Sequence, residues 1–146
     1  MADFSTGLRI SSSGLSAQRM RMNTISSNIA NINTTRTPEG GPYRRKDVVF
    51  EAMPEARNFG ELVTMPPNDN FQRVQVTDVN VDQDAVDLRY EPDHADANEQ
   101  GYVAYPKINL MEEMANMIQA TRSYEANVSA IQASKDMALG ALEIGR

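Results

Sequence analysis

This 146-residue chain has no cysteine and no tryptophan, a single histidine, and only 6% aromatic residues. Without cysteine it can form no disulfide, no thiol nucleophile and no cysteine-bound zinc site. The shortage of aromatic side chains argues against one large core, because these side chains bury the most area. Thiol-dependent enzymes and disulfide scaffolds are therefore excluded, and we expect no catalytic residue, no metal site and no cofactor.

Long apolar runs are also missing. No stretch approaches the roughly 18 apolar residues of a membrane-spanning helix. The first residues, "MADFSTGLRISSSG", lack the basic region and the apolar run of a secretory signal peptide. We expect no direct membrane insertion and no cleaved signal peptide.

Charge is divided unevenly along the chain. Residues 1–46 hold seven Lys or Arg against two acids, a net charge of +5, and the other hundred residues hold seven against eighteen, a net charge of −11. Opposite charges can steer two copies toward one another. They can equally be solvated polar faces of separate elements, and the sequence leaves both interpretations open.

Two segments have the alternating 4-3 apolar spacing of helices with a narrow apolar seam. The first covers residues 1–35 and the second residues 109–146, where Asn109 has the position of an N-cap and Gly145 can end the helix. Gly7 and Gly14 lower the intrinsic helicity of the first segment, so we expect further helices from other copies to complete its packing. The predicted core and interface residues are Leu8, Leu15, Met22, Ile25, Asn28, Ile29, Asn31, Met114, Met117, Tyr124, Asn127, Val128 and Ile131.

The middle segment, residues 36–108, has a different pattern. "YRRKDVVFE" and "FQRVQVTDVNVD" are rich in β-branched residues, and "AVDLRYE" suggests a third short strand. Prolines, asparagines and aspartates mark the turns between them. The predicted fold is mainly α, with two long terminal helices that form a coiled-coil-like hairpin around a small β insertion.

Asparagine is concentrated where the first helix should end, in "NIANINTT" at residues 28–35. An Asn side chain both donates and accepts hydrogen bonds, which suits a contact of fixed register between two helices or two subunits. Alternatively, Asn31, Asn33 and Thr34 end the helix by competing for its backbone groups. Asn28 lies inside the helix, where the first explanation fits better.

Three ligand-binding interpretations are weak. "YEPDHADANE" gathers His94 with four acids, but one histidine cannot supply a typical zinc site, so this is a solvated acidic loop or a weak calcium site. "RRK" at residues 44–46 lacks the interleaved aromatics of a nucleic-acid surface. The first helix carries Ser and Asn rather than the Lys, Trp and Phe of a membrane-surface helix. We expect neither nucleic acid nor membrane as a partner.

Two longer stretches resemble a known family. "SGLSAQRMRMNTISSNIANINTT" at residues 13–35 is similar to the N-terminal signature of the bacterial flagellar rod and hook axial proteins. "YEPDHADANEQGYVAYPKINLMEEMANMIQATRSYEANV" at residues 90–128 resembles the proximal-rod branch of that family. The matching positions are Ser27, Asn28, Ile29, Ala30, Asn31 and Asn33, and Glu113, Met114, Met117, Arg122, Tyr124, Glu125, Ala126 and Asn127.

The resemblance implies a structural subunit of the flagellar basal body, exported by the flagellum's own type III apparatus and polymerised into the periplasmic rod that carries torque to the hook. Its expected partners are other copies of itself, other rod proteins, the basal-body membrane ring and the export apparatus. In that family the terminal helices line the inner tube and the middle segment lies outside. A soluble coiled-coil adaptor or secretion-associated interaction protein is the alternative.

Overall fold

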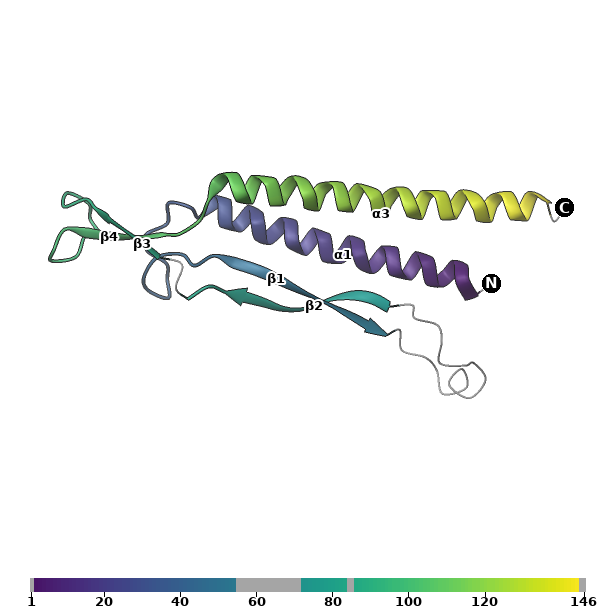
Figure 1. The fold of residues 1–146 in the computed structure, drawn as a ribbon, viewed down its shortest axis with the longest axis horizontal. Helices are drawn as coiled ribbons and strands as arrows, with labels where there is room; N and C mark the ends of the chain where they lie inside the picture. Colours follow the sequence, from purple (N-terminus) through teal and green to yellow (C-terminus); the bar gives the residue numbers. More distant parts are fainter. Residues whose placement is uncertain (1, 55–71, 84–85, 145–146) are drawn as a thin grey trace.

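The protein is elongated, with two long helices side by side and two β-hairpins (Figure 1). The computed structural model describes residues 2–54, 72–83 and 86–144. Its elements are α1 (Ala2–Ala30), β1 (Lys46–Pro54), β2 (Gln72–Val81), β3 (Val86–Tyr90), β4 (Tyr102–Pro106) and α3 (Leu110–Ile144). The prediction of two long helices around a small β insertion is confirmed, and the strands of the insertion pair antiparallel.

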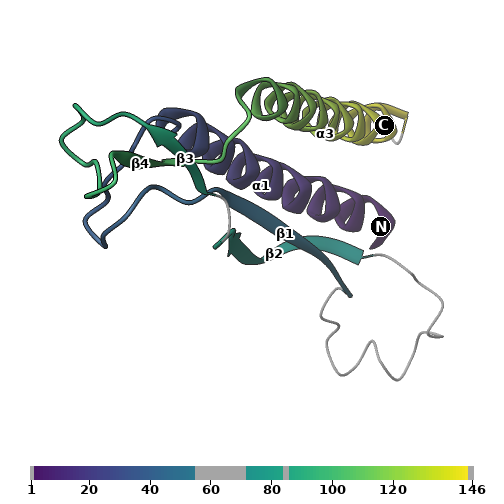
Figure 2. The same ribbon diagram turned by 60° about the vertical axis from the view of Figure 1, so that its left-hand side comes forward.

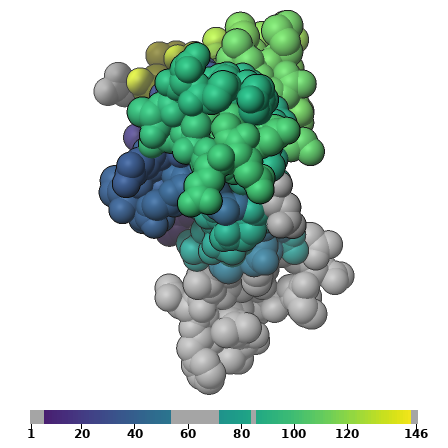
Figure 3. All heavy atoms as spheres, turned by 90° about the vertical axis from the view of Figure 1, so that its left-hand side faces the viewer, coloured from purple at the N-terminus to yellow at the C-terminus, as the bar shows by residue number. Residues whose placement is uncertain are grey.

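The first helix, α1, lies between α3 on one side and the β1–β2 hairpin on the other. The two helices run in opposite directions, and the views in Figures 1 and 2 agree on this layering. The second hairpin, β3–β4, projects beyond the end where α1 stops and α3 starts. In the end view of Figure 3 it covers this end, next to the loop that follows α1. The middle segment thus supplies two separate hairpins rather than one module.

The end of α1 is set by Asn31. Its backbone N–H and its side-chain Nδ2 both donate to the carbonyl of Ser27, at 3.1 and 2.9 Å. Thr34 Oγ1 then donates to Asn31 Oδ1 at 3.1 Å, in the turn that leaves the helix. The helix ends at Ala30 rather than at residue 35, because the next backbone bonds, from Ile32 to Ile29 and from Thr34 to Asn31, have a three-residue spacing in place of the four-residue α-helical spacing.

The start of α3 is set by Asn109, as its N-cap position predicts. Its Oδ1 accepts a hydrogen bond from the backbone N–H of Met111 at 3.0 Å, and its carbonyl accepts from Glu113 N–H at 3.0 Å. Glu112 lies in the first turn, where negative charge favours the helix dipole. Gly145, the predicted helix end, lies outside the described residues.

The side of α3 that faces α1 differs from the apolar stripe expected from the sequence. Its most buried members are Glu113 and Ala120, each 1% exposed, and Asn127 lies one further repeat along the same line. This line is shifted by one position from the predicted Met114 and its neighbours, and Met114 is 48% exposed. Small and polar side chains let the helices approach closely, which large side chains would prevent.

Gly14 shows how close this approach is. A Cβ atom at Gly14 would lie 3.0 Å from Asn127 Oδ1 and 3.2 Å from its Nδ2. Asn127 is held in place by the hydrogen bond from its Nδ2 to the carbonyl of Ser123, at 2.8 Å. Gly14 lowers the intrinsic helicity of α1, but its missing side chain allows α3 to pack closely against α1.

Both sheets are two-stranded antiparallel hairpins. In β1–β2 the register shifts between Val49 and Phe50, so that Val49 pairs with Asp78 and Phe50 with Val76. Hairpin β1–β2 is tied to α1 by Ser13, whose hydroxyl accepts from the backbone N–H of Val74 at 3.1 Å. Strand β4 was not predicted from the sequence; its "YVAYP" is short and follows a turn at Gly101.

Candidate functional site

Two polar side chains near the helix ends, Asn28 and Glu113, are each only 1% exposed in the described part of the chain. Asn28 belongs to α1. Its Nδ2 donates to the carbonyl of Lys46 at 2.8 Å and to Glu113 Oε2 at 3.2 Å. Its Oδ1 accepts from the hydroxyl of Tyr43 and from the backbone N–H of Lys46, both at 3.0 Å. All four hydrogen-bonding positions of the amide are therefore used inside one chain.

Glu113 provides the link to α3. It is 1% exposed, and besides Asn28 it accepts a hydrogen bond from Arg45 Nε at 2.8 Å. Burial alone would lower the pKa of Arg45, but the hydrogen bond and the attraction to Glu113 outweigh it and raise that pKa. The buried carboxylate is thus paired and hydrogen-bonded, which is what a charge needs in order to remain inside a protein.

We call this cluster the polar hub: Asn28, Tyr43, Arg45, Lys46 and Glu113. It joins the last turn of α1, the loop that enters β1, and the first turn of α3. Ser27 Oγ lies 3.2 Å from the Tyr43 hydroxyl and extends the hub along α1. The hub fixes the register of three segments at once, because no member can move without leaving a buried polar group unpaired.

Local sequence explains how the chain returns to Asn28. The loop after α1 turns at Gly40 and Gly41, whose φ angles of 91° and 77° suit residues without a Cβ. Thr34 and Tyr43 are joined by a backbone hydrogen bond of 3.0 Å, which closes the loop. The loop therefore places Tyr43 and Lys46 next to α1, within hydrogen-bonding distance of Asn28.

A polar groove of about 270 Å³ opens beside the hub, between α1, β1 and α3. It is lined by Arg21, Thr24, Ile25, Arg45, Lys46, Asp47, Val48, Glu112, Glu113 and Asn116. Three basic and three acidic side chains balance each other there. The groove therefore offers no net charge that would select a small charged ligand.

The predicted residues of α1 and α3 are buried to different degrees in the single chain. Ile25 and Asn28 are buried in the single chain, whereas Met114 is exposed. Asn28 makes no use of a neighbouring copy, since its amide is saturated within the chain. The remaining residues are partly buried between or beside the helices: Leu8, Leu15, Met22, Ile29, Asn31, Met117, Tyr124, Asn127, Val128 and Ile131.

Sequence reasoning missed four of the five members of the hub. The sequence places Tyr43, Arg45 and Lys46 only in a loop and a predicted strand, and Glu113 only in a family motif. The available signal was Glu113 itself, an acid one position from the apolar stripe of a long helix. A periodicity argument built on apolar residues does not select a buried ion pair.

The acidic loop has a structural role in the described part of the chain. Asp96 Oδ2 accepts from Thr35 Oγ1 at 2.8 Å, and Asp96 Oδ1 lies 3.7 Å from Arg36 Nη1. The loop therefore ties the β3–β4 hairpin to the segment after α1. Across residues 2–54, 72–83 and 86–144, no group of three acidic or histidine side chains could hold a metal ion. No helix in the same ranges is long and apolar enough to cross a membrane.

Comparison with known proteins supports the family resemblance at both ends of the chain. The family described as "Flagella basal body rod protein" matches residues 8–36, and the family described as "Flagellar basal body rod FlgEFG protein C-terminal" matches residues 99–144. The two matches cover most of α1 and α3, together with β4.

Whole-chain relatives agree. The flagellar basal-body rod protein FlgC of Borreliella burgdorferi is 42% identical over 95% of each chain. FlgC of Bacillus subtilis is 41% identical over 95% of this chain and 96% of its own, and FlgC of Escherichia coli O6:H1 is 38% identical over 94% of each. The chain therefore belongs to the FlgC family of flagellar basal-body rod proteins and is a structural subunit of the basal body.

Proposed function

We propose that this rod subunit polymerises through its two terminal helices, which pack as a coiled-coil-like antiparallel hairpin, and that the polymer is a hollow shaft that transmits torque. The subunit is non-catalytic. It joins other copies of itself and other rod proteins, and it adjoins the membrane ring and the export apparatus. It reaches the periplasm through the flagellar type III apparatus without a cleaved signal peptide.

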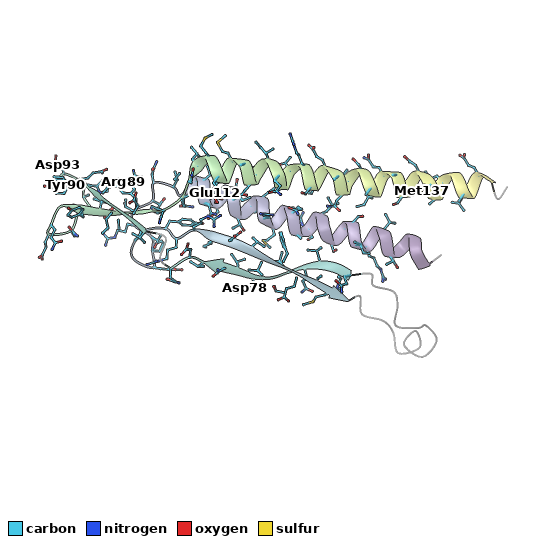
Figure 4. All side chains as sticks on the ribbon, in the orientation of Figure 1. Asp78, Arg89, Tyr90, Asp93, Glu112 and Met137 are labelled. Atoms are coloured by element: carbon cyan, nitrogen blue, oxygen red, sulfur yellow. The ribbon has the colours of Figure 1, made fainter. Side chains whose placement is uncertain are left out.

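One observation carries the assembly proposal: the first turns of α3 expose large apolar side chains. We call these the methionine ridge: Leu110, Met111, Met114 and Ile118. Met111 is 73% exposed, and by the helical period it and Ile118 lie opposite Glu113, on the side away from α1. Figure 4 shows sulfur-bearing side chains that point away from α1 at this end of α3.

An exposed ridge of this kind needs a partner. Contiguous apolar surface on a soluble protein is costly in water and marks a site of protein–protein contact. Methionine suits a surface that must meet related but non-identical neighbours, because its thioether is flexible. The seam of α3 that faces α1 is small and polar, so the apolar side remains available to other subunits.

The predicted interface residues form two groups, one for contacts between copies and one for packing within the chain. Met114, with its neighbour Met117, belongs to the proposed contact between copies. Ile25, Asn28 and Asn127 hold the hairpin itself. The contact role of the other half-buried residues on the two helices is part of the same proposal.

The test places two charges on the ridge. Met111→Lys with Met114→Lys should leave the isolated chain folded, by circular dichroism and thermal unfolding, yet should abolish its recovery in purified basal bodies. Met111→Leu with Met114→Leu is the matched control and should assemble, because it keeps the apolar surface. Normal incorporation of the double lysine variant would exclude the ridge from the contact. Electron microscopy of basal bodies with the chain tagged tests its position in the rod.

A further inference from the structure

The outer part of one face of the β3–β4 hairpin is exposed in the described chain, whereas Pro106 on the inner part of the same face is buried. The register pairs Leu88 with Ala104 and Tyr90 with Tyr102, so these four side chains share a face. Leu88 is 64% exposed, Tyr90 66% and Tyr102 42%. We call Leu88, Tyr90 and Tyr102 the tyrosine face.

The opposite face of the same hairpin is occupied. Val103 is 1% exposed, and the guanidinium of Arg89 lies 4.7 Å from the centre of the Tyr105 ring. Tyr105 donates to Glu91 Oε2 at 2.9 Å. On this face only the β4 residues are covered, because the side chains of Arg89 and Asp87 are each 55% exposed. Figure 4 shows Arg89 and Tyr90 on this projecting end of the molecule.

The tyrosine face is preformed. The rings of Tyr90 and Tyr102 meet edge to face with centroids 5.4 Å apart. Gly101, with φ of 80°, allows the Tyr90 ring so close that a Cβ there would lie 2.9 Å from it. The Thr35–Asp96 hydrogen bond holds the hairpin against the rest of the chain. Docking on this face therefore orders few groups, which reduces its entropic cost.

The charge around the tyrosine face is negative. Residues 86–106 carry five acids against Arg89, a net charge of −4 with histidine neutral. Asp93 and Glu99 are exposed. The face therefore suits a partner that combines an apolar side chain with positive charge.

Such a surface is present on α1. Arg19 and Met20 are both exposed, Met20 at 46%, and neither α3 nor the β1–β2 hairpin covers them. Residues 2–30 carry three Arg against Asp3, a net charge of +2. Thioether and guanidinium groups both pack favourably on tyrosine rings.

We propose that the tyrosine face of one copy docks on Arg19 and Met20 of α1 in a second copy. The contact cannot form within one chain: Arg19 lies 11 residues before the helix end, about 16 Å away along α1, and the hairpin projects in the opposite direction. Two different surfaces joined in this way make a heterologous contact, which propagates as an open helical array when the rotation between copies does not close a ring. The inference rests on the proposed polymerisation and names one of its contacts.

The first test uses the absence of cysteine from the chain. A variant with Met20→Cys and Leu88→Cys should give covalent dimers and longer multimers of this chain when purified basal bodies are mildly oxidised. Each single variant should give no multimer ladder. If the double variant is present in basal bodies without multimers, or if it is joined only to a different rod protein, the inference is overturned. Absence of the unmodified chain from basal bodies would instead overturn the proposed function.

A charge exchange gives a second, independent test. Arg19→Glu should lower incorporation into basal bodies by roughly tenfold, the change expected when a contact loses about 1.4 kcal/mol. Adding Asp93→Arg and Glu99→Arg to the same chain should restore it. Lys135→Glu, which changes an exposed base on α3, is the control and should assemble normally. Normal incorporation of Arg19→Glu, or failure of the exchange to restore a chain that folds normally, contradicts the inference.

Discussion

Asn28 and Glu113, separated by 85 residues in the chain, are joined by a buried hydrogen bond of 3.2 Å from Nδ2 to Oε2. This bond connects the end of one terminal helix to the start of the other. Since both side chains are almost fully buried, the relationship belongs to the folded subunit and precedes any contact between subunits.

Replacing Asn28 should destabilise the isolated chain. Asn28→Ala removes the hydrogen bonds to the backbone of Lys46 and to Glu113 Oε2, although Glu113 keeps its bond from Arg45, so we expect the free energy of unfolding to fall by about 2–4 kcal/mol. Asn23→Ala is the matched control, because Asn23 is exposed on the same helix. It should be neutral or stabilising by up to about 0.7 kcal/mol, since alanine is the better helix former. Equal denaturant midpoints for the two variants would show that the hydrogen bonds of Asn28 do not stabilise the folded chain.

A charge at Ile29 should disrupt assembly more than folding. Ile29 is half-buried in the single chain. We therefore expect Ile29→Asp to cost the isolated chain about 1–3 kcal/mol and to abolish swimming, because packing in the rod would bury the charge further. Ser26→Asp places the same charge on an exposed position of α1 and serves as control. Persistent swimming of the Ile29 variant in soft agar, with normal protein levels, would exclude this position from the assembled core.

The two glycines of α1 should respond oppositely to alanine. At Gly7 nothing lies within 4 Å of a built Cβ, so Gly7→Ala should raise the free energy of unfolding by about 0.5–1 kcal/mol. At Gly14 the new methyl group meets Asn127, so Gly14→Ala should lower it by about 1–2 kcal/mol. Chemical denaturation measures both. A similar gain at both positions would mean that the helices do not approach closely at Gly14.

Replacing Asn127 tests whether it is the side chain that the new methyl group of Gly14→Ala meets. In an Asn127→Ala background the obstructing amide is gone, and Gly14→Ala should recover part of its helical gain. A double-mutant cycle with a coupling near zero would contradict direct contact between the two positions.

Alkaline pH should loosen the β3–β4 hairpin through Tyr105. Its hydrogen bond to Glu91, together with desolvation, raises the pKa of Tyr105 above the ordinary value of 10.0. A raised folded-state pKa means that this stabilisation is fully present below pH 10 and is lost as pH rises through the folded pKa. Tyr105→Phe should remove a phenol that titrates above pH 10 from an ultraviolet titration of the tyrosines. If the phenol that disappears titrates at its ordinary value, the bond does not form in solution.

The sequence by itself determined the two helices, the family and the first three strands. Long apolar periodicity fixes helix type locally, and β-branched runs between turn residues do the same for β1 and β2. The N-cap at Asn109 was also readable, because capping depends on residues within one turn. The motif "SNIANINTT" identified the family through its order of residues, without revealing what each asparagine does.

Only the tertiary structure decided which side of each helix meets which neighbour. Glu113 and Ala120 of α3 are fully buried and Asn127 meets Gly14 of α1, whereas the predicted apolar stripe is covered only in part: Met114 is exposed, and Met117 and Tyr124 are half-buried. Periodicity shows where apolar residues lie on a helix, but it does not show which side packs against a neighbouring helix. A line of small and polar residues can face the close partner while apolar residues stay exposed. The polar hub was hidden for the same reason, since Tyr43, Arg45 and Glu113 gain their roles only when the fold brings distant segments around Asn28.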